Sequence, residues 1–270
     1  MTENRARTRL VPLAVACIVL PGRASAQEAT AVAPVTVIAA SPLPGTGVDI
    51  DKAPSAVETL SSADIARGGS ASATGALADR LAGVDLADNL GDRFQPDVTI
   101  RGFTASPVLG TPQGVAVYMN GARINEAFGE TVNWDLIPDI AVRRLDVLGA
   151  DPVFGLNALG GALVVAMKTG FSDPGGDAAL SGGSFGRREG MAEYGVNNGT
   201  FGLYLAARAL DEDGWRAFSA NRLRQAYADA SLRSGPATLD LAVSLADNGL
   251  RGESATPVQE LAVEIGRAHV

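Results

Sequence analysis

The sequence has almost no cysteine and almost no histidine. Of its 270 residues, one is cysteine (Cys17) and one is histidine (His269). Nucleophilic triads and zinc sites are built from several such side chains. The sequence also lacks the glycine motifs that bind phosphates or dinucleotides. We therefore expect no enzymatic activity, no metal site and no bound cofactor.

Basic and aromatic residues are scarce as well. The net charge is −8, aromatic residues make up 5% of the chain, and no cluster of Lys and Arg occurs beyond the first ten residues. Because nucleic-acid binding depends on Lys and Arg contacts to phosphates, we expect no nucleic-acid partner. Glycine, in contrast, is frequent, with 32 copies between short apolar runs. This composition favours β structure that is rich in turns.

Residues 1–26 have the three parts of a secretory signal peptide. A basic start is followed by the apolar run Leu10–Leu20, which is too short to span a bilayer of ~30 Å as a helix. Ala24-Ser25-Ala26 then supplies a cleavage site of small residues. We expect export, a mature chain that begins near Gln27, and loss of Cys17. The alternative is a core helix.

Residues 27–52 are rich in Ala, Pro, Val and Thr and predict an extended leader. A single β-prone island, Val35-Thr36-Val37-Ile38-Ala39, lies in this leader between Pro34 and Pro42. An extended segment with free backbone groups can bind a partner by adding a strand to the partner's sheet. The alternative is a linker with a chance Val-Thr-Val run.

Residues 53–170 predict a compact α+β domain. Ser61 and Asp64 have the spacing of a capping box, and Thr74 is expected to cap a second helix. Asn120-Gly121 predicts a two-residue hairpin turn. Strands are expected at Val98–Phe103, Val115–Met119, Ala122–Asn125, Ile140–Leu148 and Ala162–Thr169.

After Gly170, segments of about ten residues alternate in polarity, the length that a tilted transmembrane strand needs. The clearest is Ala237–Ala246, in which every second residue is Leu or Val. Phe201, Leu203 and Leu205 alternate with Tyr204, and Arg208 lies on the face of Tyr204. We expect residues 171–264 to form about five strands of an antiparallel transmembrane β-barrel, too few to close it.

Two alternatives remain open in this region. The strands alone also fit a soluble β-sandwich. Residues 265–270 look like a translated sequencing adapter, so they are left out of the fold prediction. The alternative is that they begin a genuine strand.

Several segments resemble signatures of the TonB-dependent outer-membrane receptors. Val98–Phe103 resembles the Ile-Arg-Gly strand of their plug domain. Val115–Gly121 is similar to the plug's Val-Tyr-x-Asp-Gly hairpin, although Asn120 replaces the Asp. Val147–Leu163 keeps the glycine spacing of a third plug signature, and Phe128–Pro138 resembles the ferric-citrate-receptor-like subgroup. The likeness extends from about Val35 to Gly252 and implies a plug domain followed by the first barrel strands.

This resemblance implies active transport across the bacterial outer membrane, of a ferric siderophore or a similar chelate. The partners would be TonB, the ligand and outer-membrane lipid. TonB would bind the TonB box, which consists of Val35, Thr36, Val37, Ile38 and Ala39. With about eight residues between Gln27 and this box, no additional signalling domain is expected. The alternatives are a passive outer-membrane barrel, an adhesin, or a non-functional truncated plug.

The resemblance also suggests site residues. The apical loops of the plug, Thr104–Gln113 and Asn125–Trp134, would contact the ligand, with Arg123 meeting an anionic chelate and Phe128 and Trp134 stacking on it. The alternative for both rings is packing in the core. Arg101 and Arg143 would pair with barrel carboxylates and lock the plug. Because the mature chain lacks native His and Cys, we expect the chelate to be bound intact rather than stripped of its metal.

Overall fold

The structure, a computed structural model, describes residues 37–38, 48–49, 56–67 and 72–252. The predicted signal peptide, most of the leader and residues 265–270 lie outside these ranges. Two short strands of the leader, β1 (Val37–Ile38) and β2 (Val48–Asp49), pair antiparallel, with Val37 opposite Asp49. None of the described helices has the length and hydropathy needed to cross a membrane.

The α+β domain is built on a five-stranded sheet with the order β3-β9-β10-β7-β8. β10 and β7 pair in parallel, whereas the other pairs are antiparallel. The neighbouring strands β10 and β7 are rich in Val and Ala and are buried almost throughout, which is typical of strands covered on both faces. The strands are β3 (Val57–Ser61), β7 (Val115–Met119), β8 (Ala122–Arg123), β9 (Val142–Leu148) and β10 (Gly161–Met167).

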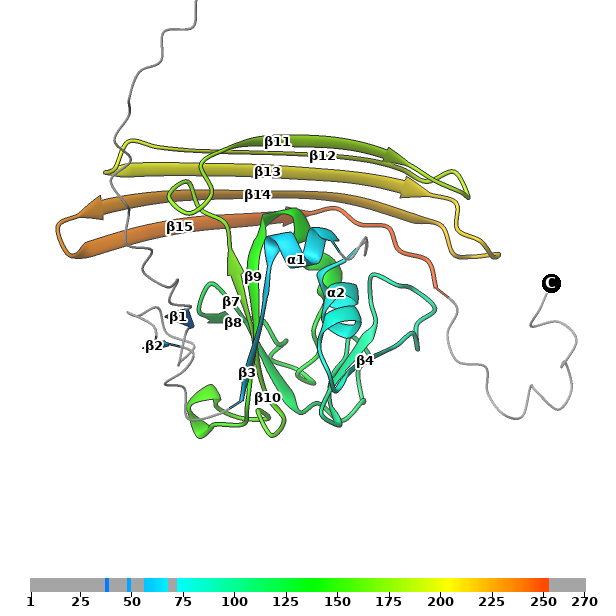
Figure 1. The fold of residues 1–270 in the computed structure, drawn as a ribbon. Helices are drawn as coiled ribbons and strands as arrows, with labels where there is room; N and C mark the ends of the chain where they lie inside the picture. The colour runs from blue at the N-terminus through cyan, green and yellow to red at the C-terminus, as the bar shows by residue number, and fades with distance from the viewer. Residues whose placement is uncertain (1–36, 39–47, 50–55, 68–71, 253–270) are drawn as a thin grey trace, which may run out of the picture. The chain divides into compact units, whose positions relative to one another are not determined.

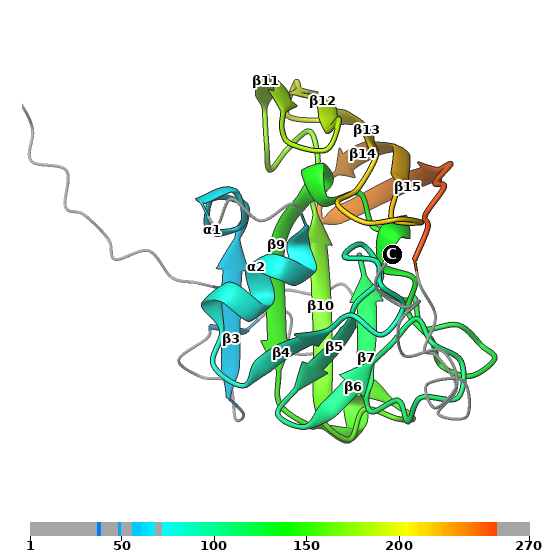
Figure 2. The same cartoon turned by 90° about the vertical axis from the view of Figure 1, so that its right-hand side faces the viewer.

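Two helices and a smaller sheet cover one face of this sheet (Figure 2). The helices are α1 (Ser62–Arg67) and α2 (Ala73–Arg80), and the small sheet contains β4 (Val84–Ala87), β5 (Asp97–Ile100) and β6 (Phe103–Ala105). Leu77 of α2 and Ile100 of β5 are buried in the same core as Leu163 of β10. The described part of the domain also contains the 3-10 turns η2 (Trp134–Leu136), η3 (Asp139–Ala141) and η4 (Pro152–Phe154).

Of the two predicted helix starts, one is confirmed and the other is wrong. The capping box is confirmed: Ser61 N donates to Asp64 Oδ2 (3.0 Å), and Asp64 N donates to Ser61 Oγ (3.3 Å). The second cap is not Thr74, which lies inside α2. Ser72 has the extended backbone of a cap residue and accepts a hydrogen bond from Gly75 N at 3.2 Å.

The strand predicted through Val98–Phe103 is in fact a hairpin. Arg101 (φ 52°) and Gly102 (φ 88°) both have positive φ, so the chain turns there and β6 returns along β5. The hairpin predicted at Asn120-Gly121 is confirmed, with φ of 48° and 82°. An Arg-Gly turn carries a weaker signal than Asn-Gly, because Arg seldom adopts positive φ.

Five long strands follow the α+β domain and form a second sheet, the long-stranded sheet, in simple sequence order (Figure 1). Every neighbouring pair is antiparallel. This confirms the predicted five strands, and the last strand has the predicted bounds. The strands are β11 (Gly175–Gly182), β12 (Arg188–Asn197), β13 (Phe201–Glu212), β14 (Asn221–Ser234) and β15 (Ala237–Ala246).

The connection between the α+β domain and the long-stranded sheet is tightly packed at Gly170. A Cβ atom at this position would lie 2.4 Å from Leu203 N and 2.5 Å from Val196 O, so only glycine fits without displacing backbone. Asn197 Nδ2 also donates to Gly170 O at 2.8 Å. The connection is therefore held between β12 and β13.

Candidate functional site: the contact between the α+β domain and the long-stranded sheet

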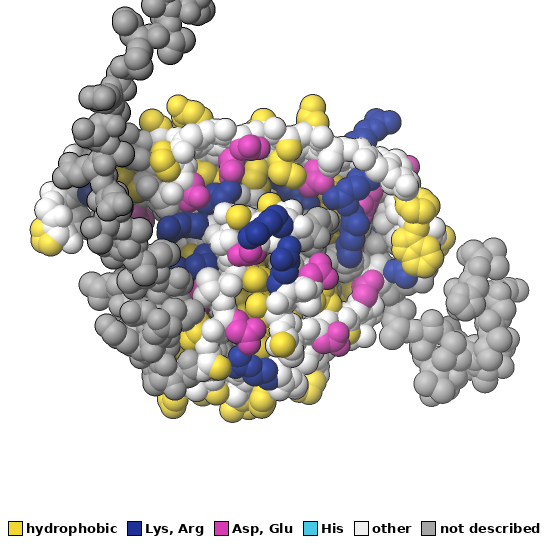
Figure 3. Space-filling model, in the orientation of Figure 1, with side chains coloured by type: hydrophobic (Ala, Val, Ile, Leu, Met, Phe, Trp, Pro, Cys, Tyr) yellow, Lys and Arg dark blue, Asp and Glu magenta, His cyan; other side chains and the backbone are white. Residues whose placement is uncertain are grey.

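The long-stranded sheet is polar on its buried face and apolar on its exposed face. Along β13, Tyr204 and Arg208 are buried, whereas Phe201 and Leu205 are about half exposed. On β15, Leu239 and Leu245 are more than 60% exposed. Figure 3 shows hydrophobic side chains along the upper edge of this view and side chains of both charges below them. This is the reverse of a water-soluble sheet, which buries its apolar face.

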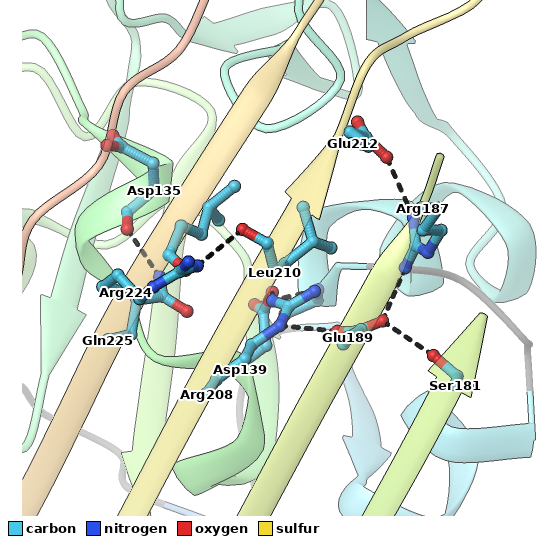
Figure 4. A network of polar contacts seen from close by, with 12 residues as sticks. Asp135, Asp139, Ser181, Arg187, Glu189, Arg208, Leu210, Glu212, Arg224 and Gln225 are labelled. Atoms are coloured by element: carbon cyan, nitrogen blue, oxygen red, sulfur yellow. Dashed lines mark hydrogen bonds and ion pairs between the residues drawn. The ribbon is translucent and has the colours of Figure 1, made fainter. Parts of the chain in front are cut away.

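The buried face holds an ion pair that joins the two parts. Arg208 Nη1 of β13 lies 2.9 Å from Asp139 Oδ2 of η3, and Arg208 Nε lies 2.8 Å from Glu189 Oε1 of β12 (Figure 4). The Arg208 side chain is only 3% exposed. One guanidinium group therefore binds two carboxylates, one from each part of the chain.

Asp139 is also tied to the second helix. Its Oδ1 accepts a hydrogen bond from Ala73 N, at the first residue of α2, at 3.0 Å. Burial raises the pKa of the Asp139 carboxyl, while the positive charge of Arg208 acts in the opposite direction. Asp139 joins α2, η3 and β13 at one point.

The network continues toward the far end of the long strands. Arg187 Nη2 lies 2.7 Å from Glu189 Oε2, and Arg187 Nη1 lies 3.4 Å from Glu212 Oε2. Glu212 also pairs with Arg93, in the loop between β4 and β5. Charges of alternating sign thus run from that loop to Asp139.

A second ion pair lies at the end of the domain's central strand. Lys168 Nζ, just after β10, lies 2.6 Å from Glu193 Oε2 of β12. The hydroxyl of Tyr204 donates to the same carboxylate. Three ion pairs join the α+β domain to β12 or β13: Arg208 with Asp139, Lys168 with Glu193, and Arg93 with Glu212. We call this part of the contact the ionic contact.

The contact with β14, β15 and the segment after them is made by amide and hydroxyl donors, and one of its acceptors is the Asp135 carboxylate, which accepts from Asn248 Nδ2 at 3.0 Å. Gln225 Nε2 donates to the backbone carbonyls of Asp135 (2.6 Å) and Ile137 (3.3 Å). Asn248 Nδ2 donates to Asp135 O at 2.8 Å, and Ser244 Oγ to Leu136 O at 3.4 Å. Amide and hydroxyl groups of the long-stranded sheet region thus bind backbone carbonyls of η2 and the residue after it. We call this part the amide contact.

The loop that carries Arg93 holds an unusual carboxyl group. Asp92 is buried, and its Oδ2 has no hydrogen-bond partner in the structure. Burial, assisted by repulsion from Asp88 and Glu212, raises the pKa of Asp92 to about 6, although Phe94 N donates to its other oxygen. The Asp92 carboxyl therefore changes its charge near pH 6.

The predicted ligand-contact residues fall into three different settings. Arg123 Nη2 pairs with Glu130 Oε2 (2.5 Å) and donates to Leu156 O (2.7 Å), so Arg123 links the loops that contain them. Phe128 is 79% exposed, whereas Trp134 is 5% exposed and packs in the main core. Of the two rings, only Phe128 is accessible to a ligand in this conformation.

The two predicted locking residues, Arg101 and Arg143, have different partners. Arg101 Nη2 is 3.2 Å from Glu58 Oε1, so this ion pair lies inside the α+β domain. Arg143 Nε is 3.8 Å from Asp173, in the segment that leads to β11, and its side chain is half exposed. Of the TonB-box residues, Val37 and Ile38 form β1; Val35, Thr36 and Ala39 lie outside the described residues.

Sequence reasoning did not find the residues that make the contact. Asp139, Glu189, Lys168 and Gln225 belong to no motif. The available signal was the alternation of β13, which placed Tyr204 and Arg208 on the polar face. Their partners come from distant segments, and only the folded chain brings them together.

Residues 49–162 match the family model described as the TonB-dependent receptor plug domain. No curated protein sequence matches the chain. The fold is similar to that of the ferric citrate transporter FecA in its unliganded form, with a TM-score of 0.60 and 16% identity over 80% of this chain and 34% of that one. The closed form of the ferric-catecholate import receptor Fiu from E. coli K12 gives 0.58 and 18%, over 74% and 27% of the two chains.

The copper transporter OprC gives a TM-score of 0.59 and 16% identity, over 73% of this chain and 31% of that one. The chain thus spans about a third of the length of these structures. The matched family model covers the α+β domain, and the similar structures extend over most of the chain. The chain therefore carries a TonB-dependent receptor plug domain over residues 49–162, followed by five antiparallel strands.

Proposed function

We propose that this chain acts in TonB-dependent transport across the bacterial outer membrane, as part of a receptor for a ferric siderophore or a similar chelate. The observation that carries the proposal is the reversed polarity of the long-stranded sheet. An exposed face of Leu, Val, Phe and Tyr suits lipid, and a polar face packed on a plug suits the inside of a barrel. The similar structures are named as transporters of ferric citrate and copper and as an import receptor for ferric catecholates.

TonB would bind the segment Val35–Ala39. The described part of this segment, Val37–Ile38, is extended and already pairs with another strand, Val48–Asp49. Backbone groups in this conformation have the geometry that strand addition to a partner sheet requires. The pairing within the leader would compete with TonB for one edge of β1.

The ligand would bind at the apical loops of the plug, which include Phe128. An exposed ring on a loop between buried segments is suited to stack on a chelate or to be covered by it. Arg123 would support this surface, because its contacts to Glu130 and Leu156 O hold two loops together. Trp134 would support the apical loops by packing in the core of the plug.

The plug would be retained by the ionic contact. Arg208 with Asp139, Lys168 with Glu193, and Arg93 with Glu212 join β12 and β13 to the plug at three points. Arg143 would add to this retention through Asp173, whereas the partner of Arg101 belongs to the plug itself. Movement of the plug would require these charges to find water or new partners.

Disulfide cross-linking to TonB tests the proposal, because the only cysteine, Cys17, precedes the predicted mature chain. A Val37→Cys variant should cross-link to a TonB C-terminal domain that carries one cysteine. The matched control is Leu156→Cys, at a position that is 81% exposed on the plug. Equal cross-linking at both positions, or none at Val37→Cys, would contradict the proposed TonB contact.

A further inference from the structure

A small cavity lies where η2 of the plug meets β14. Its volume is about 20 Å³, and its lining includes Trp134, Gln225, Thr74 and Asp139. A cavity needs about 10–15 Å³ of this kind of volume to hold one water molecule. The space therefore suits one water and excludes any larger ligand.

The orientation of Gln225 is determined by its own hydrogen bonds. Its Nε2 donates to Asp135 O at 2.6 Å and to Ile137 O at 3.3 Å. Rotating the amide by half a turn would place its oxygen against these two carbonyl oxygens, which repel it. Gln225 Oε1 must therefore point away from η2, and it is buried without a hydrogen-bond partner.

Trp134 presents the complementary group. Its indole Nε1 can only donate, and this atom is also buried without a partner. Most buried polar groups in proteins are hydrogen-bonded, to protein or to ordered water. One orphaned donor from the plug and one orphaned acceptor from the sheet thus belong to residues that line the same cavity.

We propose that this cavity binds a single structural water molecule, which accepts a hydrogen bond from Trp134 Nε1 and donates one to Gln225 Oε1. Thr74 and Asp139 offer oxygen atoms for its second proton. A cation would be repelled by the indole N–H, and an anion by the amide oxygen. Water both accepts and donates, so it satisfies both groups and adds a bridge between the plug and the barrel strands, whatever the cargo.

The two tryptophans of the chain make the test simple. In the full chain with ¹⁵N-labelled tryptophan, the Trp134 indole proton should show cross-relaxation with water of the sign produced by a long-lived bound molecule. Trp215 is 71% exposed and provides the internal reference for solvent exchange. A crystal structure should show a water within about 3.2 Å of both Trp134 Nε1 and Gln225 Oε1.

Two variants, each with a side chain close in size to the one it replaces, test which groups hold the water. Gln225→Met removes the acceptor and should abolish the bound-water signal at Trp134. Ser244→Ala removes another hydrogen bond between the sheet and η2, but Ser244 does not line the cavity, so the signal should persist. A dry cavity, a direct bond from Trp134 to Gln225, or an unchanged signal in Gln225→Met would overturn the proposal. The measurement on the unaltered chain stands even where a variant does not fold.

Discussion

The ionic contact and the amide contact hold the same plug to the same sheet in different ways. At the ionic contact, charged side chains of β12 and β13 meet charged side chains of the plug, Asp139 and Lys168. At the amide contact, Gln225 and Asn248 meet backbone carbonyls. Charge pairs depend on the identity of both partners, whereas carbonyls are present whatever the plug side chains are. The first contact is therefore sensitive to substitution, salt and pH, and the second mainly to the backbone path of η2.

Replacing Arg208, the cation that binds two carboxylates at the ionic contact, should have the largest effect on stability. Arg208→Met leaves Asp139 and Glu189 buried without their shared partner, and breaking a buried ion pair costs about 3–5 kcal/mol. We expect the free energy of unfolding, measured by urea titration in detergent, to fall by that amount. Ser244→Ala, at the amide contact, is the control and should cost about 1 kcal/mol or less. Equal losses in both variants would remove the distinction between the contacts.

The raised pKa of Asp92 makes the stability of the folded chain depend on pH. Its pKa is about 6 in the folded chain, compared with 3.8 as the ordinary value, so the folded state binds a proton more tightly between these values. Stability from this group is present below pH 4 and is lost as the pH rises through 6. Asp92→Asn keeps the oxygen that accepts from Phe94 N and removes the charge.

This variant should therefore be more stable than the unaltered chain at pH 7.5, by up to about 3 kcal/mol, and no more stable at pH 4. Unfolding midpoints measured at both pH values check the sign. The pH profile of Gln225→Met should run parallel to that of the unaltered chain, since an amide does not titrate. A gain from Asp92→Asn that is the same at both pH values would show that charge is not its cause.

Loss of the main amide donor should be costly but insensitive to salt. Gln225→Met removes the donor to Ile137 O and leaves Asp135 O with Asn248 Nδ2 alone; losing the donor to a buried acceptor costs about 1–3 kcal/mol. Raising the salt concentration from 0.05 to about 0.5 M should leave this loss unchanged, because salt screens charges. The loss in Arg208→Met, in contrast, should vary with salt. A salt dependence for Gln225→Met would mean that the two contacts are coupled.

The smallest effect is expected for Arg101, the locking residue predicted from the sequence. Its ion pair with Glu58 lies within the plug, and both side chains are a third exposed. Such pairs contribute about 0–1 kcal/mol. Arg101→Met should therefore change the unfolding midpoint little compared with Arg208→Met. A loss near that of Arg208→Met would restore Arg101 to the role that the family resemblance suggested.

The sequence predicted local features that depend on a few neighbouring residues. The capping box of Ser61 and Asp64, the Asn120-Gly121 turn and the strand β15 are all confirmed, because propensity and period act over short distances. The sequence gives little sign of the turn at Arg101-Gly102, because the β-prone run Val98–Ile100 extends up to it. The true cap Ser72 lies two residues from Thr74 and has similar chemistry, so the sequence alone does not distinguish them.

The contact itself had no comparable signal. Asp139 and Arg208 are 69 residues apart, and Asp135 and Gln225 are 90 apart. Nothing in the local sequence of η3 distinguishes Asp139 from an ordinary exposed Asp before an apolar residue. Its partner is decided by how the plug docks on the strands, which depends on the summed packing of the whole core.

The clamped connection at Gly170 has a mechanical consequence. Because the backbone of Gly170 is wedged between β12 and β13, the plug has no slack at its C-terminal end. A force applied to the leader would act across the plug, because the C-terminal end of the plug is fixed at Gly170. The work of such a pull would reach the interior hydrogen bonds of the plug instead of being absorbed by a loose tether.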